Sequence, residues 1–326
     1  MTAVQPTSAQ TMRRAAVRAT LAPSVHNTQP WRFVIGTDAL DVYADWTRRL
    51  QVLDPRGRQL LISCGCAVLN ARVVLAASGH EPTVARFPDP LQPDLLARLT
   101  LDGPVPDGHL ASLDPMIEAR HTNRRRFSDE TVPDAVVSGL VSAAGNEGVK
   151  VVVIARPEDR RAVAVLTQRA DRLEQADPGY QAELRAWTTD DWSRRDGVPM
   201  EAVPRSAAGS SGERLRNFDP YGLGWLPIDS DSNVDGCLLL FVTTHDTPDA
   251  WVRVGEALQR VLLEATQLGY VASPLTQLIE VADTNARLRE QLDLQMHPHV
   301  LLRVGRAATT PASRRRRLVD VLETSG

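Results

Sequence analysis

Lysine is almost missing from this chain of 326 residues, since Lys150 is the only lysine among 37 basic residues. The other basic residues are arginines, a bias that we interpret as genomic composition. With 40 acidic residues, the formal net charge is −3. This balance excludes a protein whose whole surface attracts nucleic acid or a membrane, so we expect no nucleic-acid partner and no membrane partner.

Cysteine is also scarce. The three cysteines, Cys64, Cys66 and Cys237, are too few for a disulfide framework. Cys64 and Cys66 have the spacing of a metal or redox pair, but we favour two small apolar residues near the start of a helix, and expect no metal site. The chain has no signal-peptide pattern and no run near the roughly 18 apolar residues of a membrane span. We therefore expect a cytoplasmic protein.

Several catalytic signatures are absent. No G-x-G-x-x-G follows a strand, and neither a P-loop nor a nucleophile elbow occurs. His297-Pro298-His299 lacks a third spaced ligand for a metal. These absences exclude a dinucleotide fingerprint, a phosphate-cradling P-loop and an α/β-hydrolase triad.

The loop from Ala22 to Phe33 is the most informative segment that is present. It places Ser, His, Asn, Thr and Gln side chains between Pro23 and Pro30, directly before the aromatic–apolar run Trp31–Ile35. A surface loop rarely gathers so many polar groups before a buried strand. The pattern predicts a rigid loop that aims donors and acceptors at a planar polar ligand.

The chain also contains a degenerate internal repeat. An offset of 119 aligns Asn27 with Asn146, and the apolar run 32–35 with 151–154. An offset of 190 aligns two helical patterns that each lie between glycines 14 residues apart, at positions 65 and 79 and at positions 255 and 269. The glycines predict close packing at one end of each helix and a C-cap at the other.

The two offsets differ, so the second half carries an insertion of about 71 residues between Ile154 and Gly255. It begins with a predicted helix at 156–176, opened by Pro157, and continues through a charged segment at 182–192. A Gly- and Pro-rich loop then runs from Asp196 to Gly224. Such a loop is either a lid or a surface excursion.

Three further segments carry candidate chemistry. Arg120, Thr122 and Arg124 alternate, so on extended backbone they share one face suited to an anion; the alternative is a solvated basic linker. The turn at 269–277 offers hydroxyl and amide groups. The arginine run at 314–317 precedes an apolar, strand-like run at 318–322 and supplies a second candidate anion contact.

Together these segments resemble the FMN-dependent nitroreductase superfamily, most closely its Acg-like branch of actinobacterial proteins. The resemblance rests on APSVHNTQPWRF, DPRGRQLLISCG with NARVVLAASG, RHTNRRRF, ASPLTQLIE and RRRRLVDVL. It implies an α+β fold with two tandem nitroreductase-like halves, 1–115 and 116–326, in pseudo-dimeric contact. The second half would include a lid insertion at about 175–233.

The resemblance also implies an FMN site. Its expected cofactor-binding residues lie in the polar loop, the basic segment, the turn and the arginine run: Pro23, Ser24, Val25, His26, Asn27, Gln29, Arg120, Thr122, Arg124, Pro274, Leu275, Thr276, Arg315 and Arg316. We expect no catalytic side chain, because a flavin carries the redox chemistry itself. His26 and His121 are interpreted as structural hydrogen-bonders.

Each half has lost a different part of the motif set. The first half lacks an Arg-x-Thr-x-Arg segment, and the loop of the second half retains only Asn146. We therefore expect one FMN per chain, and a monomer or weak homodimer.

The predicted function is an FMN-dependent NAD(P)H oxidoreductase that reduces nitroaromatic compounds or quinones. The alternative is a non-enzymatic flavoprotein that stores or sequesters FMN under the lid. A flavin-free interaction protein is a third, weaker hypothesis.

Overall fold

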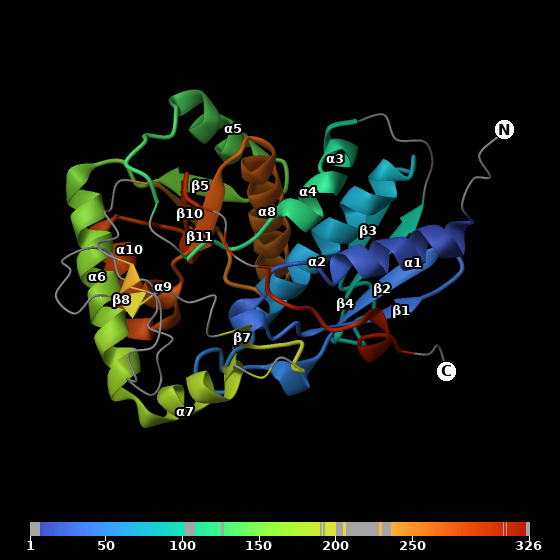
Figure 1. Cartoon of the computed structure of the whole chain (residues 1–326), viewed down its shortest axis with the longest axis horizontal. Helices are drawn as coiled ribbons and strands as arrows, with labels where there is room; N and C mark the ends of the chain where they lie inside the picture. The colour runs from blue at the N-terminus through green and yellow to red at the C-terminus, as the bar shows by residue number, and fades with distance from the viewer. Residues whose placement is uncertain are drawn as a thin grey trace.

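The computed structural model describes residues 7–101, 108–124, 127–189, 191, 193–199, 205–206, 228–229, 236–308, 310 and 312–323. The fold is α+β, as predicted. Its two largest sheets lie on either side of a central pair of helices (Figure 1). These helices are α2 (Arg58–Ala77) and α8 (Pro248–Gln267).

The first sheet has the order β1-β2-β4-β3 and the second has the order β5-β10-β12-β11, read from the matching edge. All neighbours in both sheets are antiparallel. The strands of the first sheet are β1 (Trp31–Ile35), β2 (Ala39–Ala44), β3 (Pro82–Arg86) and β4 (Leu95–Leu101). Those of the second are β5 (Lys150–Val153), β10 (Cys237–Thr243), β11 (Val271–Pro274) and β12 (His297–Gly305). The strand order is thus the same in both halves of the chain.

The remaining elements flank these sheets or connect them. The helices are α1 (Ser8–Ala19), α3 (Gly108–Ser112), α4 (Asp114–Ala119), α5 (Asp134–Gly145), α6 (Pro157–Ala176), α7 (Pro178–Trp187), α9 (Gln277–Glu280) and α10 (Ala282–Gln291). The 3-10 turns and short strands are η1 (Val25–Asn27), η2 (Trp46–Arg48), η4 (Leu318–Asp320), β6 (Thr188–Thr189), β7 (Val198–Pro199), β8 (Arg205–Ser206) and β9 (Ile228–Asp229). The boundary expected after residue 115 falls inside α4.

Glycine explains how α2 and α8 come so close. A Cβ on Gly65 would collide with the carbonyl oxygen of Val252, and a Cβ on Gly255 would collide with that of Ile62. These contacts are related by the same offset of 190. Gly79 and Gly269 follow the two helices with φ of 84° and 76°, the left-handed conformation that glycine adopts without strain. Both predicted roles of the glycines are confirmed.

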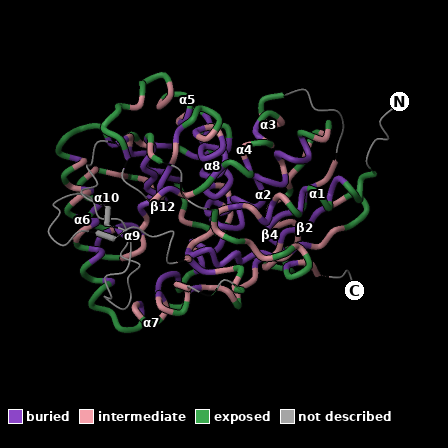
Figure 2. Tube along the Cα trace, in the orientation of Figure 1, coloured by how far each residue is buried: buried purple, intermediate pink, exposed green. Residues whose placement is uncertain are grey.

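The helix α2 also corrects an expectation about long apolar runs. It is long and apolar enough to cross a membrane by length and composition, but 89% of its most apolar window is buried in the fold. Most residues of α2 and α8 are buried, as the purple parts of the trace in Figure 2 show, and their apolar residues belong to the main core. Cys64 and Cys66 are free thiols within this buried helix, which confirms their interpretation as small apolar residues.

The insertion lies between β5 and β10, where it was predicted. The helix expected at 156–176 is confirmed by α6, and α7 includes the first residues, 182–187, of the charged segment predicted at 182–192. Asp177 caps α7 by accepting hydrogen bonds from the backbone N–H groups of Gly179 and Tyr180. Most of the predicted lid, including 207–227 and 230–235, lies outside the described residues.

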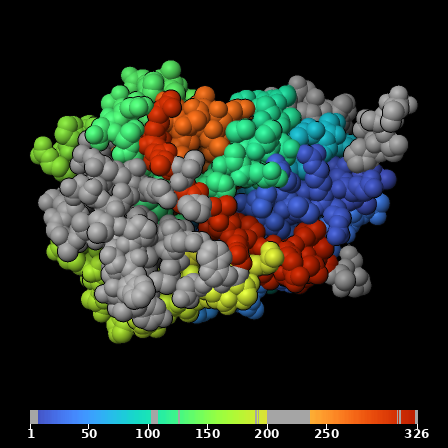
Figure 3. Space-filling model, viewed as in Figure 1, coloured from blue at the N-terminus to red at the C-terminus, as the bar shows by residue number. Residues whose placement is uncertain are grey.

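The C-terminal segment crosses the surface of the first half, where red meets blue in Figure 3. The expected strand at 318–322 is wrong over most of its length. Residues 318–320 form η4, because Asp320 accepts hydrogen bonds from both the backbone and the guanidinium of Arg317. Only Leu322 pairs with a strand, through a parallel bridge to Phe33.

Candidate functional site

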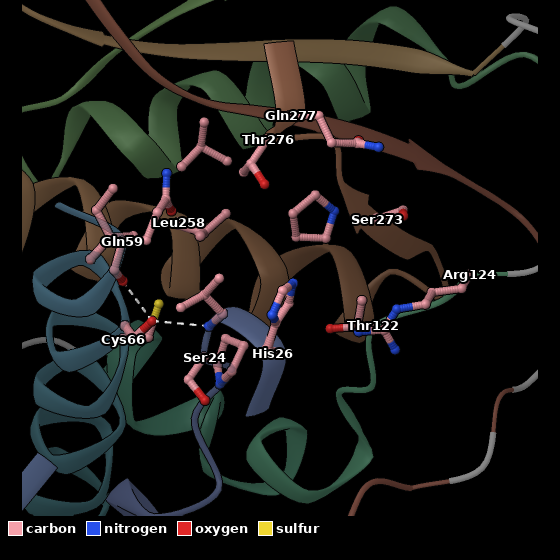
Figure 4. Close-up of a pocket in the computed structure, with 16 residues that line it drawn as sticks. Ser24, His26, Gln59, Cys66, Thr122, Arg124, Leu258, Ser273, Thr276 and Gln277 are labelled. Carbon is pink, nitrogen blue, oxygen red and sulfur yellow. Dashed lines mark hydrogen bonds between the residues drawn. The ribbon is translucent and has the colours of Figure 1, made fainter. Parts of the chain in front are cut away.

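Two adjoining pockets lie between the loop before β1, the segment after α4 and the end of β11. The larger encloses about 840 Å³ of empty space, part of it open to solvent (Figure 4). The smaller encloses about 420 Å³. Both are lined by Pro23, Ser24, Thr122 and Arg124, so the pockets meet along one wall.

The polar loop has an unusual backbone conformation. His26, Asn27 and Gln29 have φ values of 46°, 55° and 51°, a left-handed conformation that costs a non-glycine residue on the order of 1–3 kcal/mol. Such strain persists only where the surroundings impose it. Ser24 Oγ accepts from the N–H of Gln29 at 2.9 Å, and Val25 N–H donates to Ser63 Oγ at 3.2 Å.

Two amides of this loop bind neighbouring segments. Asn27 Nδ2 donates to the carbonyl of Gly197 at 2.9 Å, and its Oδ1 accepts from Arg315 Nη1 at 2.9 Å. Gln29 is fully buried. Its Nε2 donates to the carbonyl of Arg195 at 2.8 Å, and its Oε1 accepts from the backbone N–H of Arg316 at 2.7 Å. Asn27 lines the smaller pocket, whereas Gln29 and Arg316 line neither.

A cluster of arginines lines the smaller pocket. It contains Arg120, Arg124 and Arg315. Arg120 is 3% exposed, and burial lowers its pKa to about 10. Burial, followed by the neighbouring charges of Arg120 and Arg124, lowers the pKa of Arg315 to about 9. The same factors, burial first and then Arg120 and Arg315, lower the pKa of His121.

Some N–H groups of this cluster have no acceptor. Among the described residues, Nε and Nη1 of Arg120 and Nε of Arg315 are buried without a hydrogen-bond partner. Neither arginine forms a salt bridge within the described part of the chain. An unpaired buried cation is costly, and a bound anion at this position would remove that cost.

The extended backbone that holds the basic segment is also as predicted. Thr122 forms a parallel bridge to Ala272 of β11, and Asn123 N–H donates to the Ala272 carbonyl at 3.0 Å. Arg120, Thr122 and Arg124 line the smaller pocket together. The alternative of a solvated linker is therefore wrong for Arg120, which is buried.

The turn after β11 forms the opposite wall of the larger pocket. Pro274 and Thr276 line it, together with Ser273 and Gln277. Leu275 does not, because its side chain is buried in a second apolar core with Leu278 and Leu301. Val25 and His26 complete the predicted residues that line this pocket.

Sequence reasoning missed the face of α2 that lines the larger pocket. Gln59, Ile62, Ser63 and Cys66 line it at the i, i+3, i+4, i+7 spacing of one helical face. Burial raises the pKa of the Cys66 thiol to about 12. The available signal was the presence of polar residues, Gln59 and Ser63, on an otherwise apolar helix.

The strained polar loop, the donors of Arg120 and Arg315 and the adjoining larger pocket together form an arrangement suited to an anionic ligand. No family model matches the chain. A Mycobacterium tuberculosis H37Rv protein provisionally named NAD(P)H nitroreductase Rv3131 is 34% identical over 321 residues, covering 97% of this chain and 92% of its own. The provisionally named NAD(P)H nitroreductase acg of that organism is 29% identical and covers 95% of this chain and 94% of its own.

The chain belongs to this Acg-like family of the nitroreductase superfamily. Among solved structures, the FMN-dependent nitroreductase NfnB from Mycobacterium smegmatis in complex with NADPH matches with a TM-score of 0.43 and 18% identity. That match covers 67% of this chain and 100% of the other. A nitroreductase with bound FMN from Desulfitobacterium hafniense matches with a TM-score of 0.41 and 15% identity, covering 63% and 94%.

Proposed function

We propose that this protein binds FMN in the two adjoining pockets and acts as an NAD(P)H-dependent oxidoreductase. The observation that carries the proposal is the pair Arg120 and Arg315, which have buried N–H groups without partners among the described residues. When bound, FMN supplies two-electron chemistry between NAD(P)H and an electron acceptor. We propose nitroaromatic compounds or quinones as acceptors.

The residues present fit FMN. A phosphomonoester carries nearly two negative charges at neutral pH and three strong acceptor oxygens. Arg120 and Arg315 offer the unsatisfied donors, and Arg124 and Thr122 line the same pocket. The adjoining pocket, between the loop at 23–27 and the turn at 273–277, would hold the ring.

The roles of the protein side chains in this proposal are to bind, orient and exclude water. His121 also lines the smaller pocket, and in the ligand-free protein its pKa is lowered by burial first and then by the charges of Arg120 and Arg315. Arg316 would act indirectly, because its backbone N–H donates to Gln29 and so helps to position the polar loop.

We further propose one FMN per chain, bound between two halves that form an intramolecular pseudo-dimer. The offset of 190 relates Cys66, which lines the larger pocket, to Glu256. Glu256 is fully buried and binds Arg72 at 2.8 Å and Arg86 at 2.6 Å. A closed ion-pair network therefore lies where the repeat would put a second pocket, and a monomer would be self-sufficient.

One observation favours FMN storage as a second candidate function. Residues 194–199 of the insertion bind the polar loop through Asn27 and Gln29, and Arg48 forms a salt bridge with Asp196. A segment tied this closely to the ring-binding loop would restrict access to a bound flavin. Tight FMN with no turnover is the result that storage predicts.

Anaerobic stopped-flow absorbance of the FMN-loaded protein separates the two functions. Rapid bleaching of the flavin band with NADPH or NADH, followed by reoxidation with a nitroaromatic compound or a quinone, is expected for the oxidoreductase. A flavin band that stays oxidised with both reductants would contradict the oxidoreductase and support storage. A protein that takes up no FMN would overturn both.

A further inference from the structure

Two buried amides face the larger pocket from different halves of the chain (Figure 4). Gln59 lies in the first turn of α2 and is 5% exposed, and Gln277 begins α9 and is 2% exposed. The Nε2 atom of each is buried, with no hydrogen-bond partner among the described residues. Neither residue lines the smaller pocket, which contains the arginine cluster.

Buried donors without partners are uncommon in folded proteins and call for an explanation at each site. An amide N–H that is shielded from water loses its hydrogen bond to solvent, and regains one only when an acceptor enters the pocket. The positions of Gln59 and Gln277 suit such a role, because the backbone around each is fixed. Ser63 Oγ donates to the Gln59 carbonyl at 2.7 Å, and the Gln277 carbonyl accepts from Val281 N–H at 3.1 Å.

The chemistry of the acceptor follows from that of the donors. Neutral amides are suited to donate to a neutral sp² oxygen. The smaller pocket next to them instead offers guanidinium groups, which are suited to a group with a full negative charge. The two donors come from separate elements, Gln59 from α2 and Gln277 from α9, so a ligand in the pocket would meet them at different points of the wall.

We propose that Gln59 and Gln277 form a two-donor receptor for sp² oxygen in the larger pocket. This inference rests on the proposed FMN function and names the residues that fix its specificity. The oxygen belongs either to a ring carbonyl of the flavin or to the nitro or quinone group of the acceptor. The two sources are separated by the experiment.

The test uses full-length protein carrying Gln59→Met or Gln277→Met, which keep the side-chain length and remove the donors. Gln59→Asn and Gln277→Asn, which keep an amide but withdraw it, serve where a methionine variant does not fold. Gln267→Leu is the control, because Gln267 is on α8 and its amide binds only exposed Ser112 at 3.4 Å. Each protein is titrated with FMN, its flavin midpoint potential is measured, and KM and kcat are determined with nitrofurazone and menadione.

A receptor for the flavin carbonyl predicts that FMN Kd rises about tenfold and the midpoint potential becomes more negative, while KM for both acceptors stays the same. A receptor for the acceptor predicts unchanged Kd and potential, and a KM about tenfold higher. Folded variants that stay within twofold of wild type in Kd and KM, with an unchanged potential, overturn the inference while leaving the proposed function intact. Wild-type protein that takes up no FMN overturns both.

Discussion

Arginines on the two sides of the α2–α8 contact differ in whether a carboxylate pairs with them. On one side, Arg120 is buried and Arg315 is half-buried, and neither forms a salt bridge among the described residues. On the other, Glu256 binds Arg72 and Arg86, and Glu147 binds Arg260 at 2.8 Å. The comparison indicates that the paired arginines contribute to the fold, whereas the role that we propose for Arg120 and Arg315 is to bind an anion.

The pKa shifts follow the same division. Burial lowers the pKa of Arg120 and nothing nearby offsets it strongly. Burial also opposes the charge of Arg72, but the carboxylates of Glu256 and Glu147 raise its pKa above the ordinary value. Buried ion pairs offset their desolvation only with such close partners. The charge of Arg72 is therefore balanced by nearby carboxylates, whereas the charge of Arg120 is not.

Removing the acid from the paired side should have the largest effect. Glu256→Gln leaves Arg72 and Arg86 without their shared carboxylate in a buried site. We expect the free energy of unfolding to fall by about 3–5 kcal/mol, the range for breaking a buried ion pair. Urea unfolding monitored by circular dichroism measures it.

The control for that variant is Asp41→Asn, which breaks the bidentate pair with the half-exposed Arg98. A surface pair contributes about 0–1 kcal/mol. Equal losses from the two variants would contradict the claim that the buried network around Glu256 contributes more to the fold than a surface ion pair.

Removing a charge from the unpaired side should separate stability from binding. Arg120→Leu takes away a buried cation without a salt bridge, so the FMN-free protein should be as stable as wild type or more stable. Its FMN affinity should fall about 10- to 100-fold, since a hydrogen bond to a charged group contributes about 1.5–3 kcal/mol. Fluorescence titration and urea unfolding measure the two quantities. A large loss of stability with unchanged affinity would mean that Arg120 is structural.

Asp54 shows the same effect of burial on an acidic side chain. Burial raises its pKa to about 6 from the ordinary 3.8, although the Leu60 N–H donates to it at 2.9 Å. Between these pH values the folded protein keeps a proton that the unfolded chain has released. The free energy of unfolding should therefore fall by about 2 kcal/mol as pH rises from about 4 to 6, and by less than about 1 kcal/mol more from this group above pH 6. Asp54→Asn should lack this decline when the two proteins are unfolded in urea at pH 4, 5, 6 and 7. Parallel pH profiles would contradict it.

The smallest effect concerns the thiols. Burial raises the pKa of Cys66 to about 12 and that of Cys237 to about 11. At pH 8 few of these thiols are ionised, so the folded protein should react with a disulfide reagent more than tenfold more slowly than the protein in urea. Fast labelling of Cys66 in the folded protein would mean that the pocket is wetter than its burial indicates.

The sequence was informative where function resides in a contiguous segment. Residue type alone identifies three segments: the polar loop at 23–29, the basic segment at 120–124 and the turn at 273–277. The structure brings all three together around the two pockets. The paired glycines likewise predicted the close contact between helices, because only a missing Cβ permits it.

The sequence was uninformative where a role depends on distant packing. Gln59 and Cys66 lie on a helix that is buried on nearly every side, so only the crossing with α8 decides which face meets the pocket. Leu275 was predicted as a site residue, but its side chain is buried in an apolar core. The strand expected at 318–322 failed because a local contact between Arg317 and Asp320 favours a turn.

Equilibrium titration of the FMN-free protein with FMN, with Arg315→Leu beside wild type, tests the central claim most directly. The account predicts one FMN per wild-type chain, with the same stoichiometry but an affinity at least tenfold weaker in the variant. Two FMN per chain would mean that the Glu256 network does not close the second position. No binding, or equal affinity in the two proteins, would contradict the assignment of the unpaired arginines to the phosphate.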